Sequence, residues 1–195
     1  MNQLETTYNE SFFAHRNSLL WRSEFIGPAI KEVYDPNSIV DVGCAIGDFV
    51  QWFDEHKIRT RGIEGSTAAS KYIVCKPEHI IYHDMRKPYT PAVPYSLAMA
   101  IEVAEHVEPE YAEIFVKNMV NLSYDLLLTI SGPGEKGHSH VNLQPMEYWD
   151  NLFAKHRYYR NKTTEKLLKE KLDVHKSNRW ISAIIQHLCC YRKAA

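Results

Sequence analysis

The sequence predicts an α/β fold built on a doubly wound, mostly parallel sheet with helices on both of its faces. Short apolar runs, each followed by a glycine or an acidic turn, recur along the chain. Such runs are typical of strands that are buried on both faces. Helical patterns lie between the runs, and this alternation indicates parallel strands joined by helical crossovers.

We expect five strands in the first two thirds of the chain and a closing strand near its end. The expected strands are 38–42, 60–63, 80–83, 97–103 and 125–131, with the weakly alternating run 186–192 as the last. The expected helices are 49–58, 68–75, 111–120, 148–153, 164–172 and 180–185. Three prolines predict a loop over 84–95.

Length and composition restrict the class of protein. A chain of 195 residues is the size of one domain, and 45% hydrophobic with 24% charged residues excludes a largely disordered chain. A net charge of −1 excludes a binder of polyanions by bulk charge.

The lack of a recognisable targeting signal and the pattern of the cysteines predict a cytoplasmic protein. The N-terminus lacks a basic stretch followed by an apolar run, and no apolar stretch approaches the roughly 20 residues that span a bilayer. We therefore expect no membrane association. The four cysteines, Cys44, Cys75, Cys189 and Cys190, form no CxxC pair and are expected to be buried reduced thiols.

The strongest motif is IVDVGCAIGDF at 39–49, in which a predicted strand enters a glycine turn and then a helix. Gly43 and Gly47 let the backbone approach a ligand closely. A dinucleotide enzyme is expected to carry GxGxxG here, whereas this chain has Ala45 at a glycine position. Asp41, at the strand end, repels a pyrophosphate and favours a cationic ligand.

Two further carboxylates follow the next two predicted strands. Glu64 ends the second strand about 20 residues after the glycine turn, where an acid can accept both ribose hydroxyls of an adenosine. Asp84 follows the third strand and can accept from an adenine amino group. The alternative interpretations are a solvated helix cap for Glu64 and a turn cap for Asp84.

Together these motifs resemble those of the class I S-adenosylmethionine-dependent methyltransferases. The resemblance covers about 38–153 and, with the closing strand, nearly the whole chain. It implies a Rossmann-like seven-stranded sheet. It also implies that S-adenosylmethionine is the cofactor. Ala45 stands where many members of this family have glycine, and we expect the site to remain intact despite this difference. The implied cofactor-binding residues are Asp41, Gly43, Cys44, Ala45, Gly47, Glu64, Gly65, Ser66, Asp84, Met85 and Glu102.

A fourth motif, ExxEH, lies at the end of the fourth predicted strand. Its members Glu102, Glu105 and His106 are spaced to lie on one helical turn. The second cluster, Gly-His-Ser-His at 137–140, follows the fifth strand. Because the two strands are expected to be neighbours, their carboxyl ends bring the clusters together. Carboxylates with imidazoles favour a divalent ion, Mg²⁺ or Mn²⁺.

This motif resembles the metal-dependent O-methyltransferases of ubiquinone biosynthesis and the small-RNA 3′-terminal 2′-O-methyltransferases. The implied metal ligands are Glu102, Glu105, His106 and His140, with His138 as a substitute for the last. His106 and His140 are the candidate catalytic residues. The alternative is a metal-free site, in which Glu102 lies near the cofactor and His106 is a plain acid–base group.

The resemblance also suggests how the rest of the chain is divided. We expect one methyltransferase domain over 1–195, with a helical lid or packing segment at 1–37, a cofactor-binding core at 38–153 and a basic tail with a closing strand at 154–195. The stretch 155–179 contains nine basic and three acidic residues. This excess of positive charge suits either the binding of an anionic acceptor or a solvated helix face.

The predicted function is transfer of a methyl group to a hydroxyl of a small molecule or, as a second option, of an RNA end. The alternatives are a metal-free N- or C-methyltransferase and a non-catalytic subunit that binds S-adenosylmethionine. The sequence does not indicate the oligomeric state.

Overall fold

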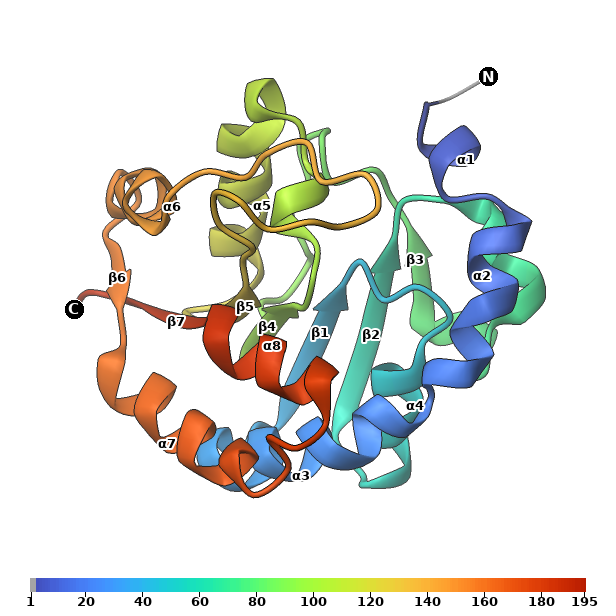
Figure 1. Cartoon of the computed structure of the whole chain (residues 1–195), viewed down its shortest axis with the longest axis horizontal. Helices are drawn as coiled ribbons and strands as arrows, with labels where there is room; N and C mark the ends of the chain where they lie inside the picture. Colours follow the sequence, from blue (N-terminus) through green and yellow to red (C-terminus); the bar gives the residue numbers. More distant parts are fainter. Residues whose placement is uncertain (1–2) are drawn as a thin grey trace.

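The computed structural model describes residues 3–195, and within this range it forms one seven-stranded sheet of order β3-β2-β1-β4-β5-β7-β6 (Figure 1). The first five strands are parallel, and β7 runs antiparallel to both β5 and β6. This arrangement confirms the predicted fold class. The strands are β1 (Ser38–Val42), β2 (Arg59–Glu64), β3 (Ile80–Tyr82), β4 (Leu97–Ala100), β5 (Asp125–Thr129), β6 (Tyr158–Arg160) and β7 (Leu188–Lys193).

Helices cover both faces of the sheet because alternate strand residues point to opposite sides. Val40 and Val42 pack toward α5 and α6, whereas Ile39 packs toward α3, α4, α7 and α8. The helices are α1 (Gln3–Thr7), α2 (Glu10–Arg16), α3 (Trp21–Tyr34), α4 (Asp48–Glu55), α5 (Ala112–Leu122), α6 (Met146–Ala154), α7 (Lys162–Asp173) and α8 (Arg179–His187).

Three elements and one cysteine differ from the sequence predictions. The expected helix at 68–75 is instead a 3-10 turn, η2 (Thr67–Tyr72). The strand expected at 97–103 ends at Ala100, because Glu102 has a left-handed backbone with φ 57°. Strand β6 was not predicted, since its three residues lie within a charged stretch that has no apolar run. Among the described residues, all four cysteines are free, but Cys75 is only half-buried.

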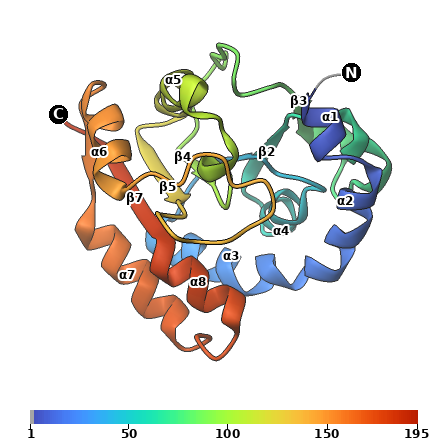
Figure 2. The ribbon, with the colours of Figure 1, turned by 45° about the horizontal axis from the view of Figure 1, so that its top comes forward.

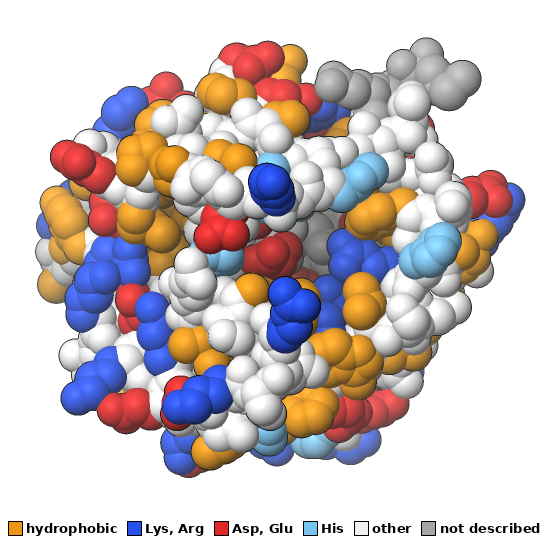
Figure 3. Space-filling model, viewed as in Figure 1, with side chains coloured by type: hydrophobic (Ala, Val, Ile, Leu, Met, Phe, Trp, Pro, Cys, Tyr) orange, Lys and Arg blue, Asp and Glu red, His pale blue; other side chains and the backbone are white. Residues whose placement is uncertain are grey.

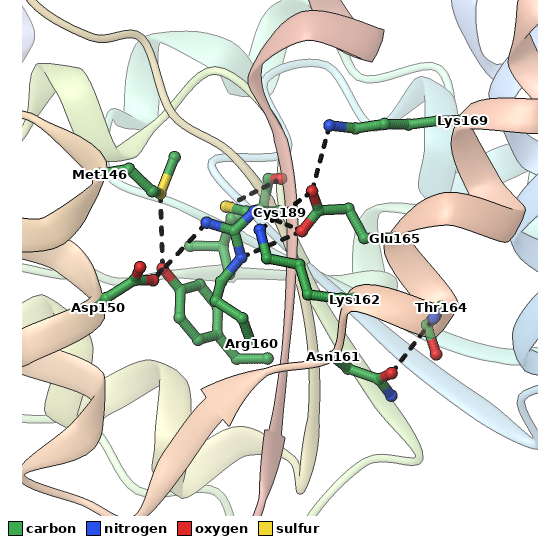
Figure 4. Close-up of polar contacts among 11 residues, drawn as sticks. Met146, Asp150, Arg160, Asn161, Lys162, Thr164, Glu165, Lys169 and Cys189 are labelled. Carbon is green, nitrogen blue, oxygen red and sulfur yellow. Dashed lines mark hydrogen bonds and ion pairs between the residues drawn. The ribbon is translucent and has the colours of Figure 1, made fainter.

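A buried ionic cluster joins β6, α7 and α6 (Figure 4). Arg160 lies at its centre and donates to Glu165 through Nε at 3.1 Å and through a second, shorter contact. Lys169 also donates to Glu165, at 3.2 Å, and Asp150 lies 3.7 Å from Arg160. The side chains of Arg160 and Glu165 are only 13% and 9% exposed, so the cluster fixes the edge strand to the helix that follows it.

Replacing Glu165 by alanine is expected to lower the free energy of unfolding by about 2–3 kcal/mol. Removing one partner of a fully buried pair costs roughly 3–5 kcal/mol, and here Arg160 keeps Asp150 as a partner. Urea denaturation measures the change. The matched control is Glu170→Ala on the same helix, whose exposed pair with Lys166 contributes at most about 1 kcal/mol. Equal effects of the two variants would contradict the structural role of the cluster.

The fold also determines where a ligand can bind. The strand order reverses between β1 and β4, and in open α/β sheets ligands bind outside the carboxyl ends of the strands at such a point. Helices α1 and α2 lie on the β3 side of this edge (Figures 1 and 2). No helix in the described range 3–195 is long and apolar enough to cross a bilayer.

Candidate functional site

A cavity of about 790 Å³ lies at the carboxyl ends of β1, β2 and β4. Its size falls in the range of pockets that enclose a small-molecule ligand. Figure 3 shows a hollow in this face with acidic side chains on its floor and histidines near its margin. Of the residues predicted as sites, the structure places the following on its wall: Asp41, Gly43, Cys44, Ala45, Glu64, Gly65, Asp84, Met85, Glu102, His106 and His140.

The turn after β1 depends on left-handed backbone conformations. Gly43 has φ 71°, and a Cβ added there would lie 2.5 Å from the Val103 side chain. Ala45 also lies in the left-handed region, at φ 51°, which is uncommon for a residue with a side chain. Gly47 has φ 82° and is the N-cap residue of α4, but it does not line the cavity. Glycine at position 43 is therefore required by the close approach of Val103 and by the positive φ, and the turn places its backbone on the cavity wall.

Glu64, at the end of β2, stabilises this turn by hydrogen bonds. Its carboxylate accepts from the amide of Ala45 at 2.9 Å and from the amide of Ser66 at 2.8 Å. Burial raises the pKa of Glu64 to about 7, although the amides of Ser66, Ala45 and Gly65 favour its charged form. Each oxygen keeps acceptor capacity, because a carboxylate offers about four lone-pair positions.

Two predicted cofactor-binding residues are held in other contacts. Ser66 does not line the cavity, and its hydroxyl lies 2.8 Å from Glu5 Oε2 and 2.7 Å from the Tyr8 carbonyl. Asp84 accepts from Arg86 Nε and Nη2, each at 3.0 Å. Burial raises the pKa of Asp84, but the bonds from Arg86 outweigh it and hold this pKa below its usual value.

Two arginines from the N-terminal helices line the same cavity, and sequence analysis missed both. Arg22 Nη2 lies 3.5 Å from Asp48 Oδ2, and both side chains are buried. Arg16 has a buried Nε that finds no hydrogen-bond partner among residues 3–195. Nearby Asp41 is buried, and burial together with the charge of Asp48 raises its pKa well above the usual value. The cavity therefore places cations and carboxylates side by side, which suits a ligand that carries both charges.

A second set of groups gathers where β4 and β5 end. One ligand atom each from Glu105, His106 and His140 lies within 4.8 Å of the others. Glu105 is fully buried, and in the described part of the chain no donor meets hydrogen-bonding geometry to either of its carboxylate oxygens, although Ser131 is close enough to favour the charged form. His106 Nδ1 lies 3.1 Å from the Ser139 carbonyl. Because a carbonyl only accepts, Nδ1 carries the proton and Nε2 is the nitrogen with a free lone pair.

Burial lowers the pKa of His106 to about 4, with further lowering from His140. His106 is therefore neutral at ordinary pH. Burial also raises the pKa of Glu105, and the charge of neighbouring Glu102 adds to this effect.

Glu102 does not join this group, contrary to the helical-turn prediction. Its left-handed backbone separates it from the 3-10 turn η4 (Ala104–His106). Its carboxylate accepts from Thr129 Oγ1 at 2.8 Å, and its amide donates to the same oxygen. The structure thus brings together three of the four predicted ligands.

The loop from 130 to 145 supplies His140 rather than His138. The amides of Val141 and Asn142 each donate to the Glu105 carbonyl at 3.0 Å, which holds the loop against η4. A Cβ on Gly137 would lie 2.1 Å from His140 Nε2, so only glycine allows this ring position. His138 is exposed and its ring faces Phe12 instead.

The basic stretch at 155–179 does not reach the cavity, since none of its residues lines the wall. Most of its charges are paired with acids. These pairs include Lys155–Glu113, Lys166–Glu170, Lys171–Glu32 and Lys176–Asp173. The observed placement favours the solvated-face interpretation.

No protein-family model and no curated protein matches the sequence. Solved structures, however, share the fold. The methyltransferase domain of bacterial CtHen1 aligns with a TM-score of 0.57 and 15% identity over 73% of this chain and 87% of that one. The O-methyltransferase of a Brevibacillus brevis trans-AT PKS multienzyme, in complex with S-adenosyl-L-homocysteine, aligns with a TM-score of 0.58 and 15% identity over 100% of this chain and 80% of that one.

A third similar structure is the sugar N-methyltransferase KedS8 from Streptoalloteichus, with a TM-score of 0.55 and 15% identity over 71% of this chain and 79% of that one. The chain therefore has the fold of the class I S-adenosylmethionine-dependent methyltransferases, as the resemblance in its motifs implied.

Proposed function

We propose that the protein is an S-adenosylmethionine-dependent methyltransferase that methylates a hydroxyl group. The carrying observation is the left-handed turn at Gly43 and Ala45, which Glu64 holds by a hydrogen bond and which shares one cavity with His106 and His140. Glu105 does not line this cavity but lies buried beside the two histidines. A fold alone does not assign an activity. The support comes from residues that suit the cofactor and residues that suit a divalent ion beside the acceptor, around one cavity.

The cofactor is proposed to lie along the carboxyl ends of β1 and β2. The turn at Gly43 and Ala45 contacts its amino-acid part, and Glu64 accepts from the ribose hydroxyls. Arg16, with its unpartnered Nε, faces the carboxylate, and Asp41 favours the ammonium group. The adenine then lies beside Asp84 and Met85.

In the transfer, the acceptor oxygen forms a bond to the methyl carbon while the bond from that carbon to sulfur breaks. The hydroxyl must pass its proton to water in the cavity, and an alcohol does so poorly at neutral pH. The pKa of about 4 at His106 makes this ring a weak base there. His106 therefore suits a ligand role better than the role of a metal-free base.

The Glu105–His106–His140 group fits a divalent metal ion. Among the described residues, no donor meets hydrogen-bonding geometry to the buried Glu105 carboxylate, and the buried His140 Nδ1 has no partner. The His106 ring is oriented by the Ser139 carbonyl with its Nε2 lone pair free. A bound divalent ion would lower the pKa of a hydroxyl placed beside it. With one carboxylate and two imidazoles, the set favours Mn²⁺ or another transition metal over Mg²⁺, which prefers oxygen ligands.

Binding of S-adenosylhomocysteine tests the cofactor assignment. At a ligand concentration of one hundred times Kd, the free energy of unfolding is expected to rise by about 2.7 kcal/mol. Glu64→Ala is expected to weaken binding by roughly 1–3 kcal/mol, because charged hydrogen bonds to the ribose are lost. Calorimetry and thermal denaturation measure both effects. Binding of NAD in place of S-adenosylhomocysteine would reject the assignment.

The affinity for S-adenosylhomocysteine is also expected to depend on pH. Because burial raises the pKa of Glu64 to about 7, the free protein loses this charge below pH 7. If binding needs the charged form, Kd rises about tenfold per pH unit below 7. Calorimetry from pH 5.5 to 8 measures the slope. Glu64→Gln cannot titrate and should remove the slope, so an equally steep profile in that variant would assign the dependence to another group.

A further inference from the structure

Arg86 joins the turn after β3 to the segment that precedes α5 through a largely buried ionic bridge. Its Nε and Nη2 donate to Asp84, each at 3.0 Å, and its Nη1 donates to Glu108 at 2.9 Å. The guanidinium also lies over the ring of Tyr111, 5.6 Å from the ring centroid. None of the three charged side chains is more than 18% exposed. These contacts fix the guanidinium beside Asp84, and both residues line the cavity.

The hydrogen bonds from Arg86 leave Asp84 one acceptor position. A carboxylate offers about four lone-pair positions, two on each oxygen. Oδ1 accepts from the Arg86 amide and from Arg86 Nε, both at 3.0 Å. Oδ2 accepts only from Arg86 Nη2 among the described residues. Both positions on Oδ1 are therefore used, whereas Oδ2 keeps one position for a donor on a bound ligand.

The same contacts keep Asp84 in its charged form. Burial raises the pKa of Asp84, but the hydrogen bonds and the charge of Arg86 hold this pKa below its usual value. A charged carboxylate carries no proton, so it accepts hydrogen bonds and cannot donate one. The ligand group that meets Oδ2 must therefore be a donor. An amino group satisfies this requirement, whereas a carbonyl oxygen would place its lone pairs against the carboxylate.

We propose that Arg86 is a positioning residue that holds Asp84 with one open acceptor position for the exocyclic amino group of the cofactor's purine. This inference rests on the proposed function and deepens it, because it adds a residue that selects a 6-amino over a 6-oxo purine. Arg86 acts through Asp84 and needs no contact of its own with the purine. The competing interpretation is a bridge that only stabilises the turn after β3.

The test compares S-adenosylhomocysteine with S-inosylhomocysteine, its analogue with a 6-oxo group in place of the 6-amino group. Calorimetry measures Kd for both ligands, and the ratio of the two values is the readout. A general loss of stability weakens both ligands alike and leaves this ratio unchanged. Wild type is compared with Arg86→Met, Arg86→Lys and Asp84→Asn. The matched control is Arg59→Met, because Arg59 also lies over a tyrosine ring, 5.5 Å from the centroid of Tyr95, but does not line the cavity.

We expect wild type to prefer S-adenosylhomocysteine by at least about tenfold, because the analogue loses a hydrogen bond to a charged group. In Arg86→Met, the buried carboxyl can rotate and take up a proton, so the preference should fall at least about threefold. Arg86→Lys keeps the charge but cannot span both oxygens, and its preference should fall at least about twofold. In Asp84→Asn, the amide can present either its oxygen or its nitrogen, which should leave almost no preference. Arg59→Met should keep the wild-type preference.

An unchanged preference in Arg86→Met would show that the bridge is only structural and would overturn the proposal. If that variant does not fold, an unchanged preference in Arg86→Lys has the same consequence. Equal binding of the two ligands by wild type also overturns the proposal, while the methyltransferase assignment stands. Failure of wild type to bind S-adenosylhomocysteine instead rejects the proposed function.

Discussion

Replacing Ala45 by valine is expected to lower the affinity for S-adenosylhomocysteine by more than about a hundredfold. Ala45 has φ 51°, a conformation that costs roughly 1–2 kcal/mol for a residue with a side chain and more for a β-branched one. Its amide donates to Glu64 at 2.9 Å, and a charged hydrogen bond of this kind contributes about 1.5–3 kcal/mol. Valine would force the turn out of this conformation and remove the bond. Calorimetry measures the loss.

Two variants separate this effect from general damage to the fold. Ala45→Gly tolerates the left-handed backbone, so its affinity should stay within about threefold of wild type. Ala154→Val places the same larger side chain at the end of helix α6, away from the cavity, and should leave cofactor binding unchanged. Normal binding by Ala45→Val would show that the turn is not part of the cofactor site.

The glycine turn and Glu64 could be predicted because they depend on short-range patterns. A buried strand, a turn and a helix follow one another within IVDVGCAIGDF, and β1 begins and ends where the sequence predicts. The acid at the end of β2 follows from the same alternation. Neighbouring parallel strands carry their carboxyl ends to one edge, which brings Glu64 to the amide of Ala45.

What the sequence did not predict depends on contacts between distant segments. Arg16 and Arg22 reach the cavity only because the N-terminal helices fold back over it. Ser66 is near Glu64 in sequence, but its hydroxyl donates a hydrogen bond to Glu5, which is far away along the chain. The periodicity of apolar residues in the sequence does not predict such contacts.

Glu102 illustrates a different limit. The spacing of Glu102, Glu105 and His106 suits one helical turn, and the sequence prediction assumed that helix. The chain instead takes a left-handed residue at Glu102, fixed by two bonds to Thr129 on the neighbouring strand. Non-glycine residues in this region are strained, and they occur preferentially at functional sites. Ala45 and Ser139, at the same cavity edge and in the adjoining loop, share this conformation.

The loss of Glu102 from the ligand set changes which ion is expected. Two carboxylates with two imidazoles allowed Mg²⁺ or Mn²⁺, whereas Glu105, His106 and His140 offer one carboxylate and two nitrogens. Imidazole binds transition metals better than Mg²⁺. The order of metal preference therefore distinguishes the structural group from the one that the sequence predicted.

If the proposed divalent ion binds, chelating it is expected to lower methyl transfer by at least about a hundredfold, because a bound cation supplies several kcal/mol of charge stabilisation. Activity after chelation should return more fully with Mn²⁺, Co²⁺ or Zn²⁺ than with Mg²⁺.

Glu105→Ala and His140→Ala should lose both the activity and the binding of Mn²⁺ seen by calorimetry, whereas Glu113→Ala and His175→Gln, which lie outside the cavity, should retain both. Glu102→Gln should still bind Mn²⁺, since its carboxylate is held by Thr129. Full activity in chelator, with both ligand variants unimpaired, would exclude a metal role for this group and leave proton removal to His106 or His140 alone.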